Sequence, residues 1–229
     1  MSGTLYLVPN LLGVASPEDV LPARTIAIAR TLVHWVVETP KPARAFLKTL
    51  AHERAIADLA IQSFQAHTAM AWLVEGHDVG VLSDAGCPGI ADPGAAIVAS
   101  AHREGLRVVP LVGPSSILLA LMASGMNGQQ FAFHGYLPVP TNEREQAIRR
   151  LEEDSRAMKR AQIFIETPYR NAAMIASLAH ALRGDTSVLV ACDLTLATET
   201  IERRIASAWK HEDPARFDKR PAIYIVEGR

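Results

Sequence analysis

The sequence predicts an α/β protein with two α/β domains, residues 1–120 around a parallel sheet and residues 121–229 around a mixed sheet. In the first part, short apolar runs alternate with helix-forming segments, which is typical of the βα units of parallel sheets. After Gly125 the pattern changes, because a long charged segment separates the next strand-like runs. With 229 residues, 49% of them hydrophobic, the chain is long enough for a sizeable core.

The first domain is predicted to begin with a strand, because residues 4–8 (TLYLV) are rich in β-forming side chains and are followed by a Pro-Asn turn. Residues 16–19 combine a cap residue, a first-turn proline and two acids, which predicts the start of a helix. The same reasoning gives further strands over residues 34–38, 79–82 and 106–112, and helices over residues 43–50, 63–75, 93–104 and 117–124.

The second domain is predicted to contain a long charged helix over residues 142–159. Its basic and acidic side chains nearly balance, so a solvated face is the ordinary interpretation and a phosphate-binding patch is the alternative. The remaining predicted elements are strands over residues 130–135, 162–166, 187–194 and 222–226, and a helix over residues 167–183.

Composition excludes several classes of protein. The net charge of −1 provides no global basic field, so nucleic-acid binding would need a local basic patch. Cys87 and Cys192 offer no disulfide framework, which favours a reducing cytoplasm. Neither a signal peptide nor a membrane-spanning helix is expected, because the amino-terminal segment lacks a basic stretch and no apolar run is long enough. The eight histidines show no metal-binding spacing, so no metal site is expected.

Four predicted loops follow strand ends, and together they indicate a ligand-binding edge. Loops at the carboxyl ends of parallel strands are where α/β proteins bind ligands, although any one of them can be an ordinary βα turn. The stretch from residue 83 to residue 94, SDAGCPGIADPG, has more turn-forming residues than a short connection requires. The four loops comprise residues 9–13, 38–44, 83–94 and 113–116.

Two features of these loops leave alternatives open. The Gly113-Pro114-Ser115-Ser116 stretch fits an anion site at a helix start, although an ordinary N-cap is the commoner reason for such residues there. Cys87 fits a nucleophile or a small space-filling residue, and no partner base can be named from the sequence. The sequence contains neither GxGxxG nor GxxxxGK[ST], so neither a common dinucleotide-binding site nor a P-loop is expected.

The order of five motifs, LYLVPN, SDAGCPGIADPG, GPSS, GYLP and ETPYRN, resembles the tetrapyrrole (corrin/porphyrin) methylase family over nearly the whole chain. Within it the chain looks most like the branch of small-subunit ribosomal RNA 2′-O-ribose methyltransferases. The resemblance implies S-adenosylmethionine in a cleft between two domains and a homodimer. The cofactor-binding residues that it implies are Leu11, Leu12, Cys87, Pro88, Gly89, Ile90, Ser115, Ser116, Glu166 and Thr167, with strand ends near Leu194 and Ile225.

The acceptor side departs from that branch, which usually has ESPHR where this chain has ETPYR and RELTK where it has CDLTL. The expected reaction is methyl transfer to ribosomal RNA, and the alternatives are a tetrapyrrole or other small-molecule acceptor, or cofactor binding without catalysis. A ribose hydroxyl needs a base more than an activated carbon does. Candidate bases are Glu38, Asp84 and Glu166, and the side chains that could orient an anionic acceptor are Lys41 and Tyr169.

Overall fold

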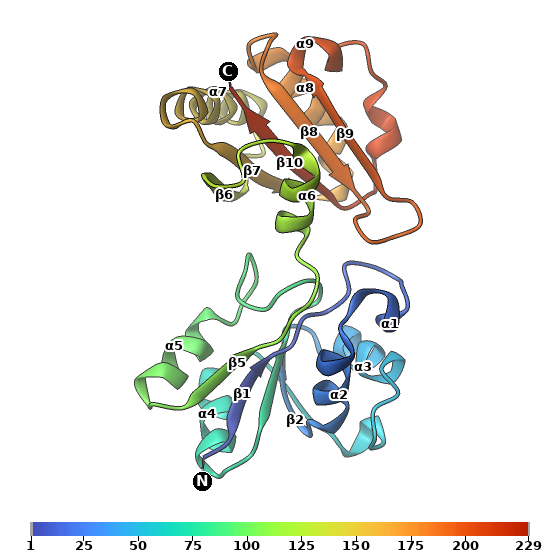
Figure 1. Cartoon of the computed structure of the whole chain (residues 1–229), viewed down its shortest axis with the longest axis vertical. Coiled ribbons are helices and arrows are strands. Elements are labelled where there is room, and N and C mark those ends of the chain that lie inside the picture. The colour runs from blue at the N-terminus through green and yellow to red at the C-terminus, as the bar shows by residue number, and fades with distance from the viewer. Residues whose placement is uncertain (1, 229) are drawn as a thin grey trace. The chain divides into compact units, whose positions relative to one another are not determined.

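The computed structural model describes residues 2–228, which form two compact units divided between Ser115 and Ser116. Each unit contains a five-stranded sheet with helices packed on it (Figure 1). One sheet is parallel and the other mixed, which confirms the predicted fold class. No helix within residues 2–228 is both long enough and apolar enough to span a membrane.

The sheet of the first unit has the strand order β3-β2-β4-β1-β5, and every neighbouring pair is parallel. All four residues of the central strand β4 are buried, as expected for a parallel strand covered on both faces. The strands are β1 (Thr4–Leu7), β2 (His34–Val37), β3 (Ala60–Ser63), β4 (Val79–Leu82) and β5 (Arg107–Pro110).

Helices cover both faces of this sheet. On one face, side chains of α2 and α3 pack around Trp35, and on the other face side chains of α4 and α5 pack around Val36. The chain thus winds to one side after β1 and to the other side after β4 (Figure 1). The helices are α1 (Pro17–Val20), α2 (Ala23–Thr31), α3 (Pro40–Thr49), α4 (Ala66–Val74) and α5 (Ala95–Arg103), with a 3₁₀ turn over Ile56–Asp58.

The sheet of the second unit has the order β6-β7-β10-β8-β9, in which only the β6–β7 pair is parallel. The strands are β6 (Phe131–Tyr136), β7 (Ala161–Glu166), β8 (Ser187–Cys192), β9 (Thr200–Ile205) and β10 (Ala222–Glu227). The helices are α6 (Ser116–Ser124), α7 (Thr141–Met158), α8 (Asn171–Ala181) and α9 (Ala206–Trp209), with 3₁₀ turns over Pro168–Arg170 and Pro214–Phe217.

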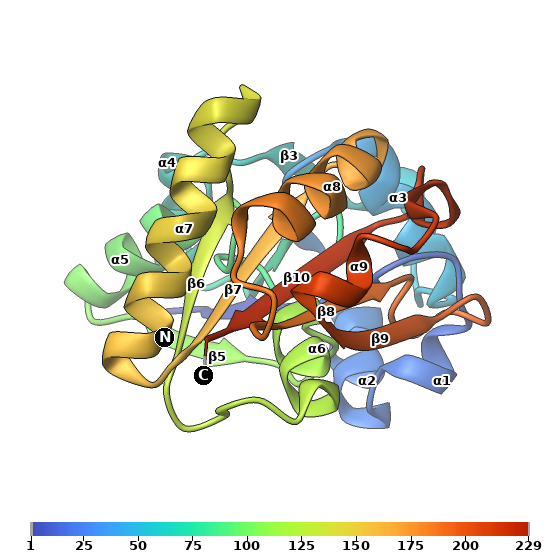
Figure 2. The same cartoon turned by 90° about the horizontal axis from the view of Figure 1, so that it is seen from above.

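The core of the second unit lies between its sheet and α7, α8 and α9, which cover the sheet in Figure 2. The rings of Phe164 and Tyr224 stack there with centroids 5.5 Å apart, on the adjacent strands β7 and β10. The Tyr224 hydroxyl donates to Oδ1 of Asn171 at 2.8 Å, so the buried phenol has a hydrogen-bond partner. The sheet and these helices therefore form two layers with the hydrophobic core between them.

The structure corrects several element assignments. Two strands were not predicted, β3 and β9, and both lie at sheet edges. Ser63 was assigned to a helix and instead ends β3, because the helix begins only at Ala66. The predicted helix at residues 93–104 begins at Ala95, so the preceding proline and glycine belong to the loop. The single helix expected after residue 16 is divided into α1 and α2.

Candidate functional site

The four predicted loops of the first unit lie along one edge of its sheet, because they follow the neighbouring parallel strands β2, β4, β1 and β5. Between β1 and β4 the connections leave toward opposite faces of the sheet. Such a topological switch point is where open α/β sheets bind ligands, outside the carboxyl ends of the strands. The first unit therefore provides a candidate ligand site at the ends of β1 and β4.

Asn10 joins the loops at this point. Its backbone N–H donates to the carbonyl of Gly86 at 2.8 Å, and its side-chain amide donates to the carbonyls of Ser83 and Asp84, each at 3.0 Å. Its side-chain oxygen accepts from the N–H of Leu11 at 2.8 Å. Asn10 is only 6% exposed. Its amide therefore fixes the 9–13 loop against the 83–94 loop, although Asn10 was not a predicted site residue.

The 113–116 loop is held by two further contacts. A Cβ on Gly113 would lie 2.3 Å from Cβ of Pro9, so only glycine allows the loops after β5 and β1 to approach this closely. The thiol of Cys87 donates to the carbonyl of Pro114 at 3.4 Å. Burial, and secondarily the charge of Asp92, raises the pKa of this thiol. Cys87 is thus held protonated between two loops, which favours a packing role over a nucleophilic one.

The 83–94 loop turns back on itself through residues with positive φ. They include Gly89 at +80°, Gly94 at +136° and Ala91 at +63°, a strained value for a residue with a Cβ. The N–H of Gly89 donates to the carbonyl of Pro93 at 3.3 Å, which closes the turn. Ile90 at its tip is 50% exposed. The loop therefore presents backbone groups and one apolar side chain to solvent at the sheet edge.

Three carboxylates gather at the same edge. The side chain of Glu38 accepts from the N–H of Asp84 at 2.9 Å, and Oδ2 of Asp84 accepts from the Thr39 hydroxyl at 2.8 Å. Burial raises the pKa of Asp92 to about 6, with smaller contributions from the charges of Glu38 and Asp84. Asp92 was not among the predicted site residues. The sequence shows that Asp92 lies in a DPG turn, but only the fold brings it close to the other two carboxylates.

The other predicted residues of this region are placed as follows. Leu11 and Leu12 are half-buried in the 9–13 loop, and a Cβ on Gly86 would lie 3.5 Å from a methyl group of Leu12. Ser115 is half-buried at the end of the first unit, whereas Ser116 is the first residue of α6 in the second unit. The predicted 38–44 loop is mostly helix, because α3 begins at Pro40.

In the second unit, Glu166 ends β7 and its side chain is buried. Its Oε1 accepts from the N–H of Thr167 at 2.6 Å and from Nε of Arg170 at 2.9 Å. No hydrogen-bond partner of Oε2 is found within residues 2–228. The carboxylate thus holds the 3₁₀ turn that precedes α8, and burial keeps it from solvent. This geometry favours a structural role over the predicted one of catalytic base.

Leu194 follows β8 and is 5% exposed, between two residues of positive φ, Asp193 at +51° and Thr195 at +72°. Such a φ is strained for a β-branched threonine. Ile225 was expected near a strand end, but it lies in the middle of β10, paired with Ile163 and Leu189, and is fully buried. Its side chain has no exposed surface with which to contact a ligand.

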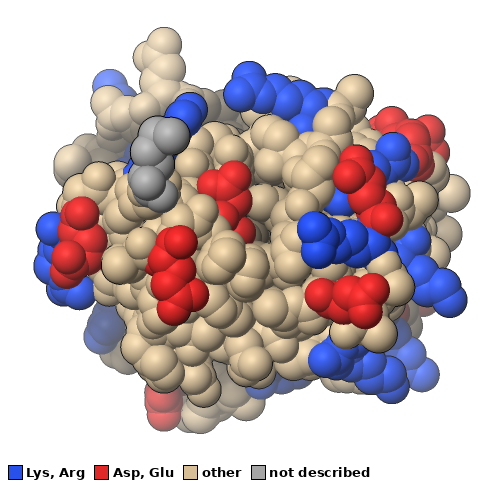
Figure 3. Space-filling model, turned by 90° about the horizontal axis from the view of Figure 1, so that it is seen from below, with Lys and Arg blue, Asp and Glu red and all other residues tan. Residues whose placement is uncertain are grey.

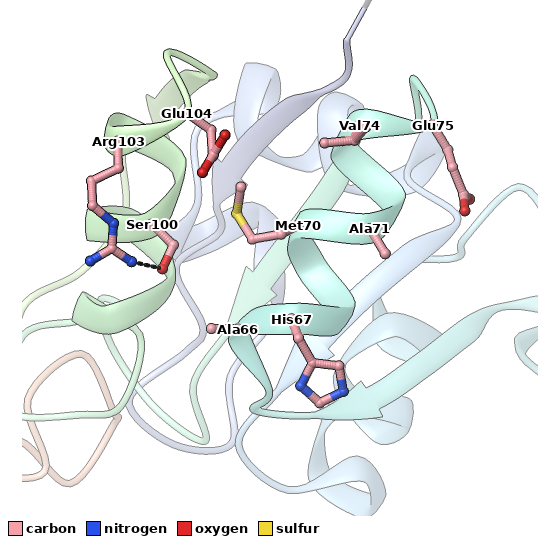
Figure 4. A pocket seen from close by; sticks show the side chains of 9 residues that line it. All are labelled: Ala66, His67, Met70, Ala71, Val74, Glu75, Ser100, Arg103 and Glu104. Atoms are coloured by element: carbon pink, nitrogen blue, oxygen red, sulfur yellow. Dashed lines mark hydrogen bonds between the residues drawn. The ribbon is translucent and has the colours of Figure 1, made fainter.

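A groove of about 570 Å³ lies elsewhere on the first unit, between α4 and α5 (Figure 4). None of the predicted site residues lines it, and in Figure 4 Met70 and Val74 of α4 face Glu104 and Arg103 of α5. The candidate site is therefore the group of loops at the carboxyl edge of the first sheet. No cluster of three His, Cys, Asp or Glu side chains that could hold a metal occurs in the described part of the chain.

A model of the family described as tetrapyrrole (corrin/porphyrin) methylases matches residues 19–207. Curated relatives carry the name ribosomal RNA small subunit methyltransferase I. The Escherichia coli O157:H7 protein is 35% identical over 167 residues, 72% of this chain and 57% of that protein. The Bacillus subtilis protein is 31% identical over 241 residues, 99% of this chain and 75% of that protein. The chain thus spans little more than half the length of some relatives.

Solved structures share the fold. The methyltransferase CobJ has a TM-score of 0.62 and 20% identity, with 99% of this chain and 95% of that chain covered. A conserved hypothetical protein from Aeropyrum pernix K1 has a TM-score of 0.71 and 14% identity, with 100% of this chain and 86% of that chain covered. At these identities the likeness concerns the fold.

Proposed function

The chain belongs to the tetrapyrrole (corrin/porphyrin) methylase family, and on that premise we propose that it methylates ribose 2′-hydroxyls of small-subunit ribosomal RNA with S-adenosylmethionine. The observation that supports binding of the methyl donor is the 83–94 loop. Asn10 holds this loop against the 9–13 loop at the switch point of the first sheet. The acceptor half rests on the names of the curated relatives.

The donor is proposed to lie against the carboxyl edge of the first sheet. There Cys87, Pro88, Gly89 and Ile90 supply backbone groups, while Leu11 and Leu12 supply apolar surface. Ser115 and Ser116, and Thr167 and Leu194 of the second unit, are carried over from the family resemblance as further contacts. Ile225 is omitted because its side chain is fully buried. S-adenosylmethionine supplies an electrophilic methyl group, so the protein needs mainly to align the acceptor with it.

The proposed proton acceptor comes from the group of Glu38, Asp84 and Asp92. Asp84 accepts a hydrogen bond from the Thr39 hydroxyl, and Glu38 accepts one from the N–H of Asp84. Asp92 is favoured as the base, because a pKa of about 6 leaves it ionised at neutral pH yet a better proton acceptor than an ordinary aspartate. The aspartate would take the ribose proton as the hydroxyl oxygen attacks the methyl carbon.

Two measurements test this function. Calorimetric titration with S-adenosylmethionine and S-adenosylhomocysteine should show binding of both, and no binding of either would refute the donor assignment. Incubation with methyl-labelled cofactor and small-subunit ribosomal RNA should then place label on a ribose. Label in a tetrapyrrole acceptor but not in RNA would assign the small-molecule alternative, and binding without transfer to either acceptor would favour a non-catalytic cofactor-binding protein.

Assembly and location follow from the same proposal. A homodimer is proposed from the family resemblance, and sedimentation of the full chain across a concentration series tests it. A cytoplasmic location is proposed because the proposed substrate is ribosomal RNA, and fluorescence of a tagged full chain tests it.

A further inference from the structure

Helix α3 carries a basic stripe on its exposed face. The stripe consists of Lys41, Arg44 and Lys48, all exposed, at positions i, i+3 and i+7 of the helix. With about 100° between successive residues, the three side chains fall within an arc of about 60° and extend over about 10 Å of helix. The helix contains no acidic residue. Its outer face is therefore a short linear array of positive charge.

The charges of this stripe are not neutralised within the described part of the chain. None of its three side chains forms an ion pair or a side-chain hydrogen bond with another residue from 2 to 228. Some other exposed bases are paired with carboxylates, as for Arg149 with Glu145 at 3.2 Å and Arg216 with Glu212 at 2.9 Å. Figure 3 shows the end of the first unit from which its strands begin, where both signs of charge are interspersed. The stripe thus concentrates positive charge, without ion-pair partners among the described residues, on one helix face of a chain whose net charge is −1.

The position of the stripe connects it with the candidate site. Helix α3 begins immediately after Thr39, whose hydroxyl donates to Asp84 in the carboxylate group at the sheet edge. Its other face is fixed in the core, where Phe46 and Leu47 are buried. A rigid helix thus extends positive charge from the site along the surface. Because its apolar face is already packed, α3 cannot insert that face into a lipid surface as an amphipathic membrane helix does.

We propose that Lys41, Arg44 and Lys48 bind successive phosphates of the RNA strand that presents its ribose at the carboxyl edge of the first sheet. This inference rests on the proposed function and adds the surface that binds the substrate. Phosphate contacts supply most of the sequence-independent affinity of RNA-binding proteins and fix the register of the strand. A basic stripe that begins at the site can supply this affinity and fix the register of the strand. The net charge of the whole chain cannot, because it is slightly negative.

The test compares three variants of the full chain. Lys41→Gln/Arg44→Gln/Lys48→Gln removes the stripe, and Lys41→Arg/Arg44→Lys/Lys48→Arg keeps its charge. Arg103→Gln/Arg107→Gln/Arg150→Gln removes the same charge from exposed positions elsewhere. Binding of a short fluorescein-labelled single-stranded RNA is measured across a salt series, with S-adenosylmethionine affinity and the thermal midpoint measured in parallel.

Loss of three phosphate contacts should lower the slope of log K against log salt by about 2, at about 0.7 for each contact to a single strand. The charge-conserving variant and the control should keep the wild-type slope, and all variants should keep the affinity for S-adenosylmethionine. A stripe variant with the wild-type slope, or a control that loses as much, would overturn this inference alone. A wild-type protein that binds the cofactor but not RNA would overturn both this inference and the RNA assignment.

Discussion

Replacement of Asn10 by alanine should loosen the candidate site and destabilise the first unit. The substitution removes three hydrogen bonds, from the side-chain amide to two carbonyls of the 83–94 loop and from the Leu11 N–H to the side-chain oxygen. At about 1 kcal/mol net for each bond, and with two of them partly reachable by water, the loss is about 2–3 kcal/mol. For a unit of this size that corresponds to a fall of about 10 °C in the unfolding midpoint.

The assays are thermal unfolding, monitored by circular dichroism, and calorimetric titration with S-adenosylmethionine. The affinity for S-adenosylmethionine should fall because the two loops are less well ordered in the variant. Asn142→Ala is the matched control, because that asparagine is exposed and its replacement should change stability by less than about 0.5 kcal/mol. Asn10→Asp should be worse than Asn10→Ala at neutral pH, because a carboxylate would face two carbonyl oxygens. It should recover on acidification, when the protonated carboxyl can donate. Equal stability of Asn10→Ala and the control would refute the reasoning.

Three further outcomes are expected. Gly113→Ala should lower both the unfolding midpoint and cofactor affinity, because its Cβ would lie 2.3 Å from Pro9; unchanged values would show that the loops can separate freely. Asp92→Asn should abolish the ionisation near pH 6 in the kcat/KM profile while raising stability at pH 7. The raised pKa means that the folded wild type binds this proton more tightly, so its stability should fall as pH rises from about 4 to about 6, and a pH-independent difference would contradict this. Cys87 should react with iodoacetamide more slowly than the exposed thiol of an Ala85→Cys variant, as followed by mass spectrometry, and faster reaction would identify an activated thiolate.

The first sheet could largely be predicted because its central strands are short apolar runs followed by glycine and proline. Two of the four edge strands, β3 and β9, gave no such pattern. Strand β9, TIERRI, carries three charged residues because it is exposed on one side, and half of the four-residue strand β3, AIQS, is polar. These compositions are also found in loops and helices. One edge strand of each sheet was therefore missed, whereas the central strands and the edge strands β5 and β6 were predicted.

The candidate site could be predicted only as a set of loops. Parallel strands imply that loops after them share one edge, so the 83–94 loop could be placed without coordinates. Which side chains meet there depends on strand order, which the sequence pattern does not specify. The strand order makes β4 the neighbour of β1 and so brings Asn10 to Gly86. The same order places Asp92 near Glu38 and Asp84, and neither relation follows from spacing along the chain.

The strand order also affects how the first unit can fold during synthesis. Strand β1 leaves the ribosome before both of its partners, β4 and β5, with which it pairs Leu5 against Val79 and Leu7 against Pro110. At about 5–20 residues per second, the first strand waits roughly 5–20 s for the last of them. During that interval both of its edges are free to pair with other chains. The nascent amino-terminal segment is therefore expected to be a substrate for chaperones until β5 has emerged.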